Sequence, residues 1–437
     1  MKKYLIIDKT IKPFKKKITV DGDKSISIRW VLISSLSKKK SIAYNLPKSE
    51  DVTSAIRCIK KLGSQVIIKK ERCEIKGIGL NDKFKKNIIL NAGNSGTLGR
   101  LILGLLVNTK NKIKLVGDNS LSRRDFSRVT KPLSEFGIKL FSNKNNLPIV
   151  MQGSISPKSI NYQELKGSAQ CKSTIMLAAL KSKGLTKIKA KKSRNHTELL
   201  FKYLNIPMKI KKSKKYDFIS IKGINKINNL NYKIPGDISS SAFFIVLTIL
   251  SKNSELLIKN ININPSRIGV IKILKKMGAK IKIINKKTYK GEQIGDIFVK
   301  SSNNLKAIKC PTKYNSSAID EFLIIFLVAA KSKGISYFKN LSELNQKESP
   351  RLIWASKILK FMGIENKITK HSIKIYGNPN IKVDKKITIK NFLKDHRVFM
   401  MSVIASLTFG GKWLIHDSSS IKTSFPSFLE KLKYLEN

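Results

Sequence analysis

The chain of 437 residues is 41% hydrophobic and 26% charged, which is enough apolar side chain to bury two or more cores and excludes a disordered chain or a disulfide-stabilised miniprotein. Its formal net charge of +59 suggests a polyanionic partner such as nucleic acid. Only 11 of the 87 basic residues are Arg, however, and the Lys residues are spread along the whole chain, so codon bias and a solvated surface explain the charge better than a nucleic-acid-binding face.

The beginning of the chain, MKKYLIIDKT, has too short an apolar run for a signal peptide. The longest apolar stretch, residues 322–330, is too short to span a bilayer. Four cysteines lie far apart without a CxxC pair, which argues against a zinc site and favours buried free thiols in a reducing compartment: Cys58, Cys73, Cys171 and Cys310. We therefore expect a cytoplasmic protein without a bound metal.

One pattern recurs along the chain: a helix-like segment ends in an apolar residue followed by Gly or Asn, and alternating strands come next. The pairs are Leu62-Gly63, Phe136-Gly137, Leu204-Asn205, Met277-Gly278 and Met362-Gly363. Gly and Asn suit this position because both tolerate the left-handed backbone conformation that ends a helix. Each repeat, about 70 residues long, is therefore predicted to contain a helix, a turn and a hairpin.

A sixth repeat is predicted at the C-terminus, where residues 424–437 resemble another such helix and the N-terminal KYLIIDKT could supply the missing strand. Six repeats are too many for one core, so we predict two lobes of three repeats. The turn Pro235-Gly236-Asp237 marks the boundary, which puts residues 20–236 in the first lobe and residues 1–19 and 237–437 in the second. Two strands then cross between the lobes and are a hinge candidate.

Two segments of the first lobe could hold an anion at a helix start. Lys24, Ser25 and Arg29 open a helix after the turn 21–23, where free N–H groups, a hydroxyl and two cations come together. The segment NAGNSGT, residues 91–97, is a small polar turn between a strand and a helix. An ordinary helix cap explains the first segment and a tight turn explains the second equally simply.

Two further segments have the same character. Residues 167–170, GSAQ, offer hydroxyl and amide groups where a helix begins, although Ser168 could simply cap that helix. Arg194 also lies at a helix start, where the helix dipole alone would not favour a cation. Its position therefore indicates a ligand.

Candidate acid–base residues gather in the second lobe. Asp320 opens a strongly apolar helix and is either its N-cap, which its position alone favours, or a base whose proton affinity is set by burial and nearby cations. Lys347, Glu348 and Arg351 follow in one short segment. Residues 395–397 are Asp-His-Arg, for which a hydrogen-bonded structural His is the simpler explanation.

Taken together, these segments resemble one family, 5-enolpyruvylshikimate-3-phosphate synthase (3-phosphoshikimate 1-carboxyvinyltransferase). The matching segments follow the family's order along the chain: GDKSISIR (22–29), GNSGTLGR (93–100), SLSRRDFSR (120–128), GSAQCKS (167–173), SRNHTE (193–198), PGDISS (235–240), AIDEF (318–322), KESPR (347–351), DHR (395–397) and TSFPSF (423–428). The resemblance implies an α/β, two-lobed enolpyruvyl transferase fold with six βαβαββ repeats, three per lobe, and two crossing hinge strands. Lobe closure on the substrates is also implied.

The resemblance implies an activity as well. The enolpyruvyl (carboxyvinyl) group of phosphoenolpyruvate would move to the 5-hydroxyl of shikimate 3-phosphate, with release of phosphate, by addition and elimination through a tetrahedral intermediate. This transferase step of the shikimate pathway leads toward chorismate and the aromatic amino acids. No cofactor or metal, no membrane and no specific nucleic acid is implied, and a monomer is expected.

The resemblance also assigns residues. Shikimate 3-phosphate would bind Lys24, Ser25, Arg29, Ser168, Ala169, Gln170, Arg194, Asp320 and Lys347. Phosphoenolpyruvate would bind Lys24, Gly96, Arg124, Gln170, Arg351 and Arg397, since forked cations suit its carboxylate and phosphate. Catalysis would use Asp320 as general base on the 5-hydroxyl, Glu348 as general acid toward the methylene carbon, and Lys24.

Three positions depart from the family pattern. Asp125 follows Arg124 where the family usually has Pro, which puts a carboxylate next to a predicted anion site. Leu101 stands where many members have Pro. Thr423 stands where many members have Lys, and Lys422, one place away, is given no role.

Alternative functions differ in identifiable features. UDP-N-acetylglucosamine enolpyruvyl transferase, from a sister family, usually has a reactive Cys in the loop corresponding to residues 118–128, where this chain has none. A non-catalytic basic nucleic-acid-binding protein is motivated by the charge alone. An inactive homologue is motivated by Asp125 and the absent late Lys, but Lys24, Asp320 and Glu348 are intact.

Glyphosate is expected to inhibit this protein. Gly96 is retained where glyphosate-insensitive members of the family carry Ala. An inhibition curve measured against phosphoenolpyruvate tests this expectation. A curve that stays flat well beyond the saturating concentration of phosphoenolpyruvate would contradict it.

Overall fold

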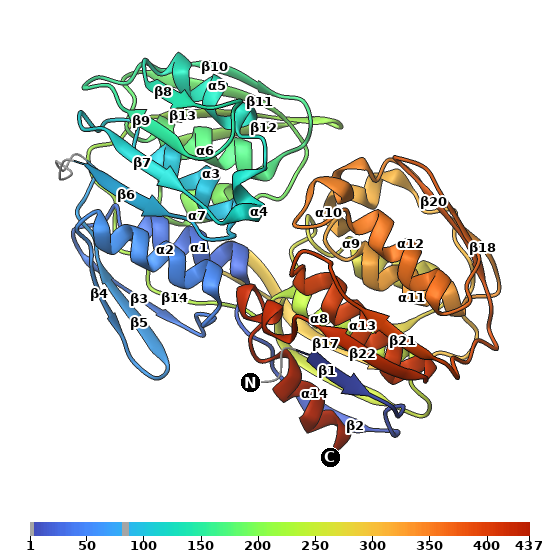
Figure 1. The fold of residues 1–437 in the computed structure, drawn as a ribbon. Coiled ribbons are helices and arrows are strands. Elements are labelled where there is room, and N and C mark those ends of the chain that lie inside the picture. Colours follow the sequence, from blue (N-terminus) through green and yellow to red (C-terminus); the bar gives the residue numbers. More distant parts are fainter. Residues whose placement is uncertain (1–3, 81–86) are drawn as a thin grey trace. The chain divides into compact units, whose positions relative to one another are not determined.

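A computed structural model describes residues 4–80 and 87–437, and the chain forms two compact units (Figure 1). Unit 1 comprises Met1–Asp21, Pro235–Tyr289 and Gln293–Asn437, and unit 2 comprises Gly22–Ile234 and Lys290–Glu292. The predicted lobe boundaries lie within two residues of the breaks at positions 21 and 234. The grouping of residues 290–292 with unit 2 had no signal in the sequence pattern.

The described residues of unit 2 form three four-stranded sheets, with strand orders β14-β3-β5-β4, β6-β7-β9-β8 and β10-β11-β13-β12. The strands are β3 (Lys40–Tyr44), β4 (Gln65–Ile68), β5 (Arg72–Lys76), β6 (Ile88–Asn91), β7 (Ile113–Val116), β8 (Lys139–Ser142), β9 (Ile149–Gln152), β10 (Asn161–Glu164), β11 (Leu185–Lys191), β12 (Met208–Lys212), β13 (Tyr216–Lys222) and β14 (Tyr232–Lys233). The helices are α1 (Lys24–Ser34), α2 (Glu50–Lys61), α3 (Gly96–Leu105), α4 (Asn119–Ser122), α5 (Ser127–Glu135), α6 (Ala169–Ala179) and α7 (His196–Tyr203).

Unit 1, over its described residues, also contains three sheets, with strand orders β16-β17-β15-β2, β18-β20-β19 and β1-β22-β21. The strands are β1 (Tyr4–Ile7), β2 (Lys15–Ile18), β15 (Glu255–Asn262), β16 (Lys280–Tyr289), β17 (Glu292–Lys300), β18 (Gly334–Phe338), β19 (Asn366–Ile368), β20 (Ile373–Gly377), β21 (Lys386–Ile389) and β22 (Lys412–His416). The helices are α8 (Ile238–Leu250), α9 (Gly269–Lys276), α10 (Asn315–Ala318), α11 (Phe322–Lys331), α12 (Arg351–Phe361), α13 (His396–Phe409) and α14 (Phe428–Glu436), with 3₁₀ turns η1 (Thr312–Tyr314), η2 (Ser342–Gln346) and η3 (Ser418–Thr423).

The predicted βαβαββ repeat is confirmed. In the second sheet of unit 2, β6 pairs in parallel with β7, and the antiparallel pairs β7–β9 and β8–β9 complete the sheet. Helix α3 follows β6 and helix α5 follows β7, so both lie on parallel crossovers. All five residues predicted to end helices have positive φ: Gly63 (109°), Gly137 (84°), Asn205 (54°), Gly278 (91°) and Gly363 (83°).

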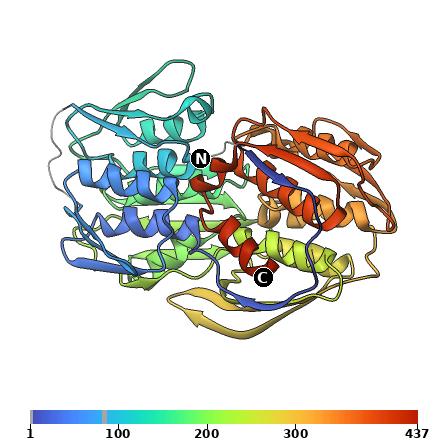
Figure 2. The same cartoon turned by 60° about the horizontal axis from the view of Figure 1, so that its bottom comes forward.

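The sixth repeat is completed by the N-terminus, as the sequence predicted. Strand β1 pairs antiparallel with β22, from Tyr4 opposite His416 to Ile7 opposite Trp413. Figure 2 shows this dark-blue strand against the red C-terminal strands. Because β2 then pairs in parallel with β15, residues 4–18 contribute to two sheets of unit 1.

Apart from the short segment 290–292, the chain passes twice between the units, at the two segments predicted to cross. Residues 19–23 lead from β2 in unit 1 to α1 in unit 2, and residues 234–237 lead from β14 in unit 2 to α8 in unit 1. The Asp237 N–H donates to the Asp21 carbonyl at 3.0 Å. The two connecting segments therefore lie side by side where they meet unit 1.

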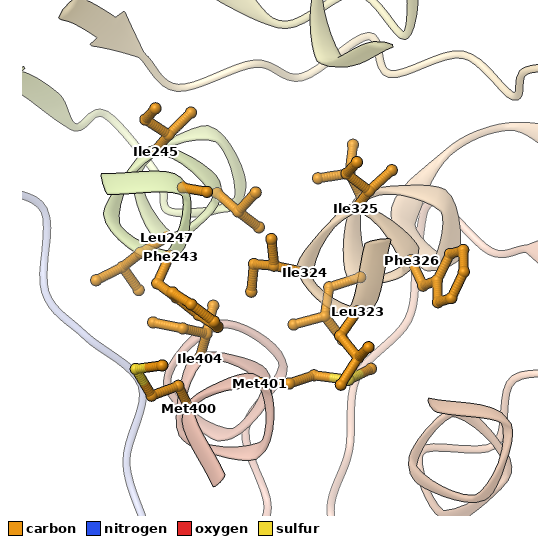
Figure 3. Close-up of a cluster of buried hydrophobic side chains, with 14 of the residues drawn as sticks. Phe243, Ile245, Leu247, Leu323, Ile324, Ile325, Phe326, Met400, Met401 and Ile404 are labelled. Atoms are coloured by element: carbon orange, nitrogen blue, oxygen red, sulfur yellow. The ribbon is translucent and has the colours of Figure 1, made fainter. Parts of the chain in front are cut away.

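In each repeat, one helix is buried on nearly all of its faces. In unit 1 these are α8, α11 and α13, and every residue of α8 is buried. Side chains of the three helices interdigitate in a common core, among them Phe243, Ile324 and Ile404 (Figure 3). A helix that is apolar on all sides is stable only when enclosed in this way. Burial of each large apolar side chain contributes roughly 1.5–3 kcal/mol.

A glycine ends the hairpin of four repeats, at a position the sequence pattern did not reveal. A Cβ atom there would lie within 2.5 Å of a backbone carbonyl oxygen just after the buried helix of the same repeat. The four glycines and their distances are Gly77 (Ser35 O, 2.3 Å), Gly153 (Val107 O, 2.5 Å), Gly223 (Ser182 O, 2.1 Å) and Gly377 (Ser332 O, 2.1 Å). The close approach of hairpin to helix therefore requires glycine at these positions.

Gly377→Ala is expected to lower the free energy of unfolding by about 1–3 kcal/mol, because the new methyl group meets backbone and not a movable side chain. Urea unfolding measures the change. Gly363→Asn is the matched control: nothing lies within 4 Å of a Cβ atom at Gly363, and Asn205 holds the equivalent position in another repeat. Equal stability of the two variants would contradict the steric explanation.

Candidate active site

The first predicted cation of unit 2 lies at the start of α1. Asp23 caps this helix by accepting a hydrogen bond from the Ile26 N–H at 2.9 Å, so the capping interpretation of the turn 21–23 is correct. Lys24 is the first residue of the helix, and its Nζ lies 2.9 Å from Asp51 Oδ2, at the start of α2. Asp51 is buried and had no functional signal in the sequence beyond its place in a first helical turn.

Arg29 is buried one turn further along α1. Its Nε donates to Thr197 Oγ1 at 2.8 Å and its Nη2 to Ser173 Oγ at 3.0 Å, while these two hydroxyls are 2.7 Å apart. Its Nη1 donates to the carbonyl of Ser25 at 3.0 Å. Arg29 therefore joins α1 to the starts of α6 and α7 and fixes the first turn of α1.

Gly96 and Arg124 lie together in unit 2. Gly96 is the first residue of α3, and Arg124 comes from the loop between α4 and α5. A Cβ atom at Gly96 would lie 3.0 Å from Arg124 Nη1 and 2.9 Å from Arg100 Nη1. Arg124 also donates to Asn94 Oδ1 at 3.3 Å. The space above this helix start is therefore bordered by two guanidinium groups.

Arg100, on α3, packs against the same helix start. It is packed over the Phe126 ring, 4.9 Å from the centroid, and donates to the carbonyls of Gly96 and Asp125, each at 3.2 Å. Burial and the neighbouring arginines lower the pKa of Arg100 to about 10. Arg100 had been noted only as one of the few arginines, without a role.

The carboxylate of Asp125, the residue after Arg124 that departs from the family pattern, is hydrogen-bonded within its own loop. Its oxygens accept hydrogen bonds from the Ser127 N–H and from Ser127 Oγ, each at 2.7 Å. Although partial burial raises the pKa of Asp125, these hydrogen bonds and nearby arginines hold it below its usual value. Asp125 thus caps the entry to α5 as an ionised side chain.

The start of α6 is as predicted. Ser168 is its N-cap and accepts from the Cys171 N–H at 3.2 Å, and Ala169 and Gln170 form the first turn. The Glu164 carboxylate accepts from the Gly167 and Ser168 N–H groups at 2.5 and 2.8 Å. Gln170 reaches across to α3 and donates to Thr97 Oγ1 at 3.0 Å.

Arg194 lies two residues before α7, in the loop that leads into the helix bearing Thr197. In unit 2 the structure therefore joins Gln170 with the start of α3, and Arg29 with α6 and α7. Four of the polar partners in these contacts had not been singled out from the sequence: Asp51, Thr97, Ser173 and Thr197.

The five predicted residues of unit 1 form one connected cluster. Asp320 lies in the turn between α10 and α11, with Oδ1 at 3.3 Å from Lys347 Nζ and 3.5 Å from Arg351 Nη1. Its backbone carbonyl accepts from Arg397 Nη1 at 2.8 Å. Glu348 completes the cluster through an ion pair with Arg351 Nη2. Asp320 and Glu348 are partly exposed, with side chains 16% and 17% accessible.

The capping interpretation of Asp320 is wrong. Glu321, not Asp320, is the N-cap residue of α11, and its side chain makes no capping hydrogen bond. Asp320 lies one residue earlier, and its side chain contacts Lys347 and Arg351. Local sequence position could not distinguish two adjacent carboxylates at a helix start.

Asp395 supports the cluster from inside. Its carboxylate, which is fully buried, accepts from Arg351 Nε at 2.8 Å, from Ser349 Oγ at 2.9 Å and from the Arg397 N–H at 2.9 Å. Burial raises the pKa of Asp395, but the contact with Arg351 outweighs burial and holds the pKa below its usual value. Burial likewise lowers the pKa of Arg351, yet the surrounding carboxylates raise it overall.

His396 and the late positions have structural partners. His396 is buried, and its Nδ1 lies 3.2 Å from Thr423 Oγ1, so the simpler explanation of a hydrogen-bonded structural His is correct. Thr423 also donates to the Ser420 carbonyl at 2.8 Å. The position where many family members carry Lys is therefore occupied by a short side chain that is hydrogen-bonded inside unit 1.

A family model for EPSP synthase (3-phosphoshikimate 1-carboxyvinyltransferase) matches residues 9–432. The chain belongs to the EPSP synthase family. Relatives named 3-phosphoshikimate 1-carboxyvinyltransferase include proteins of Petrotoga mobilis, 37% identical over 95% of each chain, and of Clostridium tetani, 34% identical over 96% of this chain and 94% of the relative. The family match favours neither the sister transferase nor a non-catalytic basic protein.

Solved structures agree with the family assignment. EPSP synthase from Acinetobacter baumannii superposes with a TM-score of 0.86 at 33% identity, covering 98% of this chain and 97% of the other. The enolpyruvyl transferase NikO from Streptomyces tendae has a TM-score of 0.77 at 12% identity, covering 99% of this chain and 97% of its own, and shows the shared fold alone. The predicted enolpyruvyl transferase fold is confirmed.

Other expectations concern membranes, metals and thiols. Among residues 4–80 and 87–437, no helix is long and apolar enough to cross a membrane, and no group of three or more His, Cys, Asp or Glu side chains is arranged to hold a metal ion. All four cysteines are buried and free, as predicted. Burial raises the pKa of both Cys58 and Cys73 to about 12, so these thiols are unreactive.

Asp395→Asn is expected to lower the free energy of unfolding at pH 7 by about 3 kcal/mol, because it leaves the buried Arg351 with an incomplete set of counter-charges. The pKa of Asp395 is depressed in the folded protein, so its stabilising contribution is present above the unfolded value of about 4 and is lost as the pH falls through the folded value. The variant should therefore lose less stability than the unchanged protein below about pH 4.

Urea midpoints measured from pH 7 to pH 3 test this expectation. Asp384→Asn, at an exposed carboxylate of the same unit, is the control and should leave both the midpoint and its acid dependence nearly unchanged. Identical acid dependence in Asp395→Asn and the unchanged protein would contradict the assigned role of the buried carboxylate.

Proposed function

We propose that the protein transfers the enolpyruvyl group of phosphoenolpyruvate to the 5-hydroxyl of shikimate 3-phosphate and releases phosphate. Membership of the EPSP synthase family supports this activity. The observation that carries the chemistry is the cluster in unit 1, where Asp320 and Glu348 share the cations of Lys347 and Arg351. The reaction belongs to the shikimate pathway toward chorismate and the aromatic amino acids.

Unit 2 is proposed to bind most of shikimate 3-phosphate. A phosphate suits a helix N-terminus with hydroxyl and cationic groups, which Ser168, Ala169 and Gln170 offer together with Arg194. Lys24 and Ser25 add a second helix start. Arg29 uses three of its five N–H donors on the hydroxyls of Thr197 and Ser173 and on the Ser25 carbonyl, so part of its proposed effect on this substrate acts through Ser25.

Phosphoenolpyruvate is proposed to bind six residues, four of which are cations. Lys24, Gly96, Arg124 and Gln170 come from unit 2, and Arg351 and Arg397 come from unit 1. The glycine matters because any side chain at position 96 would enter the space beside Arg124. Since Arg397 is held by the backbone of Asp320, phosphoenolpyruvate bound there would lie close to the proposed base.

The addition half of the proposed reaction needs one proton delivered and one removed. Glu348 gives a proton to the methylene carbon of phosphoenolpyruvate as the 5-hydroxyl oxygen attacks carbon 2, and Asp320 accepts the hydroxyl proton. In the elimination, the Glu348 carboxylate takes a proton back from the methyl group of the tetrahedral intermediate while the carbon–oxygen bond to phosphate breaks, which restores the double bond. The proton held by Asp320 passes to the departing phosphate oxygen. Preorganised cations stabilise the charges on both substrates throughout.

The remaining expectations belong to this proposal. The substrates are small molecules, the reaction uses no cofactor or metal, and the protein acts as a cytoplasmic monomer. Lys24 is proposed to take part in catalysis as well as binding, since its ammonium group lies at the start of α1 beside Asp51.

Phosphate release from phosphoenolpyruvate tests the proposed function directly. Release is expected with shikimate 3-phosphate and not with UDP-N-acetylglucosamine as acceptor. Phosphate release only with UDP-N-acetylglucosamine would assign the sister activity. No phosphate release with either acceptor, from folded protein, would refute the proposal.

Asp320→Asn and Glu348→Gln are each expected to lower kcat by about 10²–10⁴, since each removes one proton-transferring group. Both variants should fold, because the two side chains are partly exposed. Glu255→Gln is the control and should retain full turnover, because Glu255 on β15 lies in a partly exposed ion pair with Lys300 on β17. Near-normal kcat in Asp320→Asn would remove that residue from the mechanism.

A further inference from the structure

Two consecutive carboxylates at the start of α11 are held by different partners. Asp320 contacts the cations of Lys347 and Arg351, which belong to the same repeat. Glu321, the next residue, accepts a hydrogen bond from Ser239 Oγ at the start of α8, in the preceding repeat. The Asp320 turn is therefore fixed on one side by the proposed active-site cations and on the other by Glu321.

The contact of Glu321 is part of a buried chain of hydrogen bonds. Arg267 Nη2 donates to Ser239 Oγ at 2.8 Å, and the Ser239 hydroxyl donates to Glu321. A hydroxyl has one donor hydrogen and also accepts, so both contacts can exist together. Arg267 and Glu321 are each about 1% exposed. The chain therefore joins two opposite charges inside unit 1 through one hydroxyl.

The segment 267–269 also packs directly on the turn 318–321, which contains Asp320. Gly269, two residues after Arg267, packs so closely on α10 that a Cβ atom there would lie 2.3 Å from Ser317 Oγ and 2.9 Å from the Ala318 backbone nitrogen. The Ala318 carbonyl in turn accepts the Glu321 N–H at 2.9 Å. Gly269 therefore packs on the turn before Asp320, and Arg267 is linked to the turn after Asp320 through Ser239.

We propose that Glu321 and Arg267 are positioning residues for Asp320, an inference that rests on the proposed role of Asp320 as the base. They act by holding the turn 318–321 against the preceding repeat, so that the Asp320 carboxylate stays within reach of Lys347 and Arg351. A general base must lie within hydrogen-bond distance of the proton it takes, and small displacements reduce turnover strongly.

The burial of these charges argues for positioning and against a purely stabilising role. A buried ion pair loses its hydration, and apolar residues of similar volume often stabilise a fold as well or better. Arg267 Nη2 is also 3.4 Å from Asp237 Oδ1, which accepts a hydrogen bond from the Ser239 N–H at 2.7 Å. These directional contacts fix the orientation of Ser239, and through it that of Glu321.

Glu321→Gln keeps the size of the side chain and an oxygen that can accept from Ser239, but removes the charge that balances Arg267. We expect kcat to fall about 10-fold while KM for each substrate stays within about 2-fold, since the substrate-binding cations are untouched. Glu255→Gln is the matched control at a partly exposed ion pair of the same unit. Unchanged kcat in Glu321→Gln would overturn the inference.

A double-mutant cycle separates positioning from general damage. If Glu321 acts through Asp320, adding Glu321→Gln to Asp320→Asn should lower the residual kcat by less than about 2-fold, because the affected group is already gone. Arg267→Lys, which keeps the charge but loses the fork, should show the same loss in kcat and the same dependence on Asp320. Losses that multiply fully in either double variant would overturn the inference.

The same measurements distinguish this inference from the proposed function. Low kcat in Asp320→Asn with normal kcat in Glu321→Gln would refute only the positioning role. Near-normal kcat in Asp320→Asn would refute the role of Asp320 and the inference with it. A urea midpoint for each variant, compared with that of Glu255→Gln, confirms that the assayed protein is folded.

Discussion

The enclosure of one apolar helix per repeat is the constraint on which the rest of this structure depends. In unit 1, α8, α11 and α13 bury their side chains in a common core (Figure 3). Contacts at their first residues show that their N-termini lie together: Ser239 of α8 meets Glu321, which caps α11, and Arg397 of α13 meets Asp320. The segments that carry charged side chains are thereby gathered at one end of the core.

The same constraint operates in unit 2. Gln170 at the start of α6 meets Thr97 at the start of α3, and Arg29 of α1 meets Ser173 of α6. Gathered helix N-termini present unpaired N–H groups and the positive ends of helix dipoles, which favour anions. Substrates with two phosphates and two carboxylates between them suit such a fold, and the added arginines refine an existing preference.

The charged groups are balanced differently in the two units. In unit 1 the buried Arg351 is surrounded by three carboxylates. Asp395 is buried with it, and Asp320 and Glu348 are partly exposed beside it. In unit 2 the buried Arg29 is met by hydroxyls and a carbonyl. The first arrangement lowers the pKa of Asp395, and the second mainly fixes geometry.

Local chemistry determined much of this protein from the sequence alone. Residues that tolerate a left-handed backbone, such as Gly63 and Asn205, end helices, and their spacing predicted five repeats. The C-terminal helix and the N-terminal strand predicted the sixth. Arg351, in the segment 347–351, indicated an anion site from the sequence because a forked cation suits a carboxylate or phosphate. Tertiary structure decided which of Asp320 and Glu321 faces the cations, that Gly377 must lack a side chain, and that Asp51, Thr197 and Asp395 support the site. Those outcomes depend on contacts between residues far apart in the chain, which no local pattern encodes.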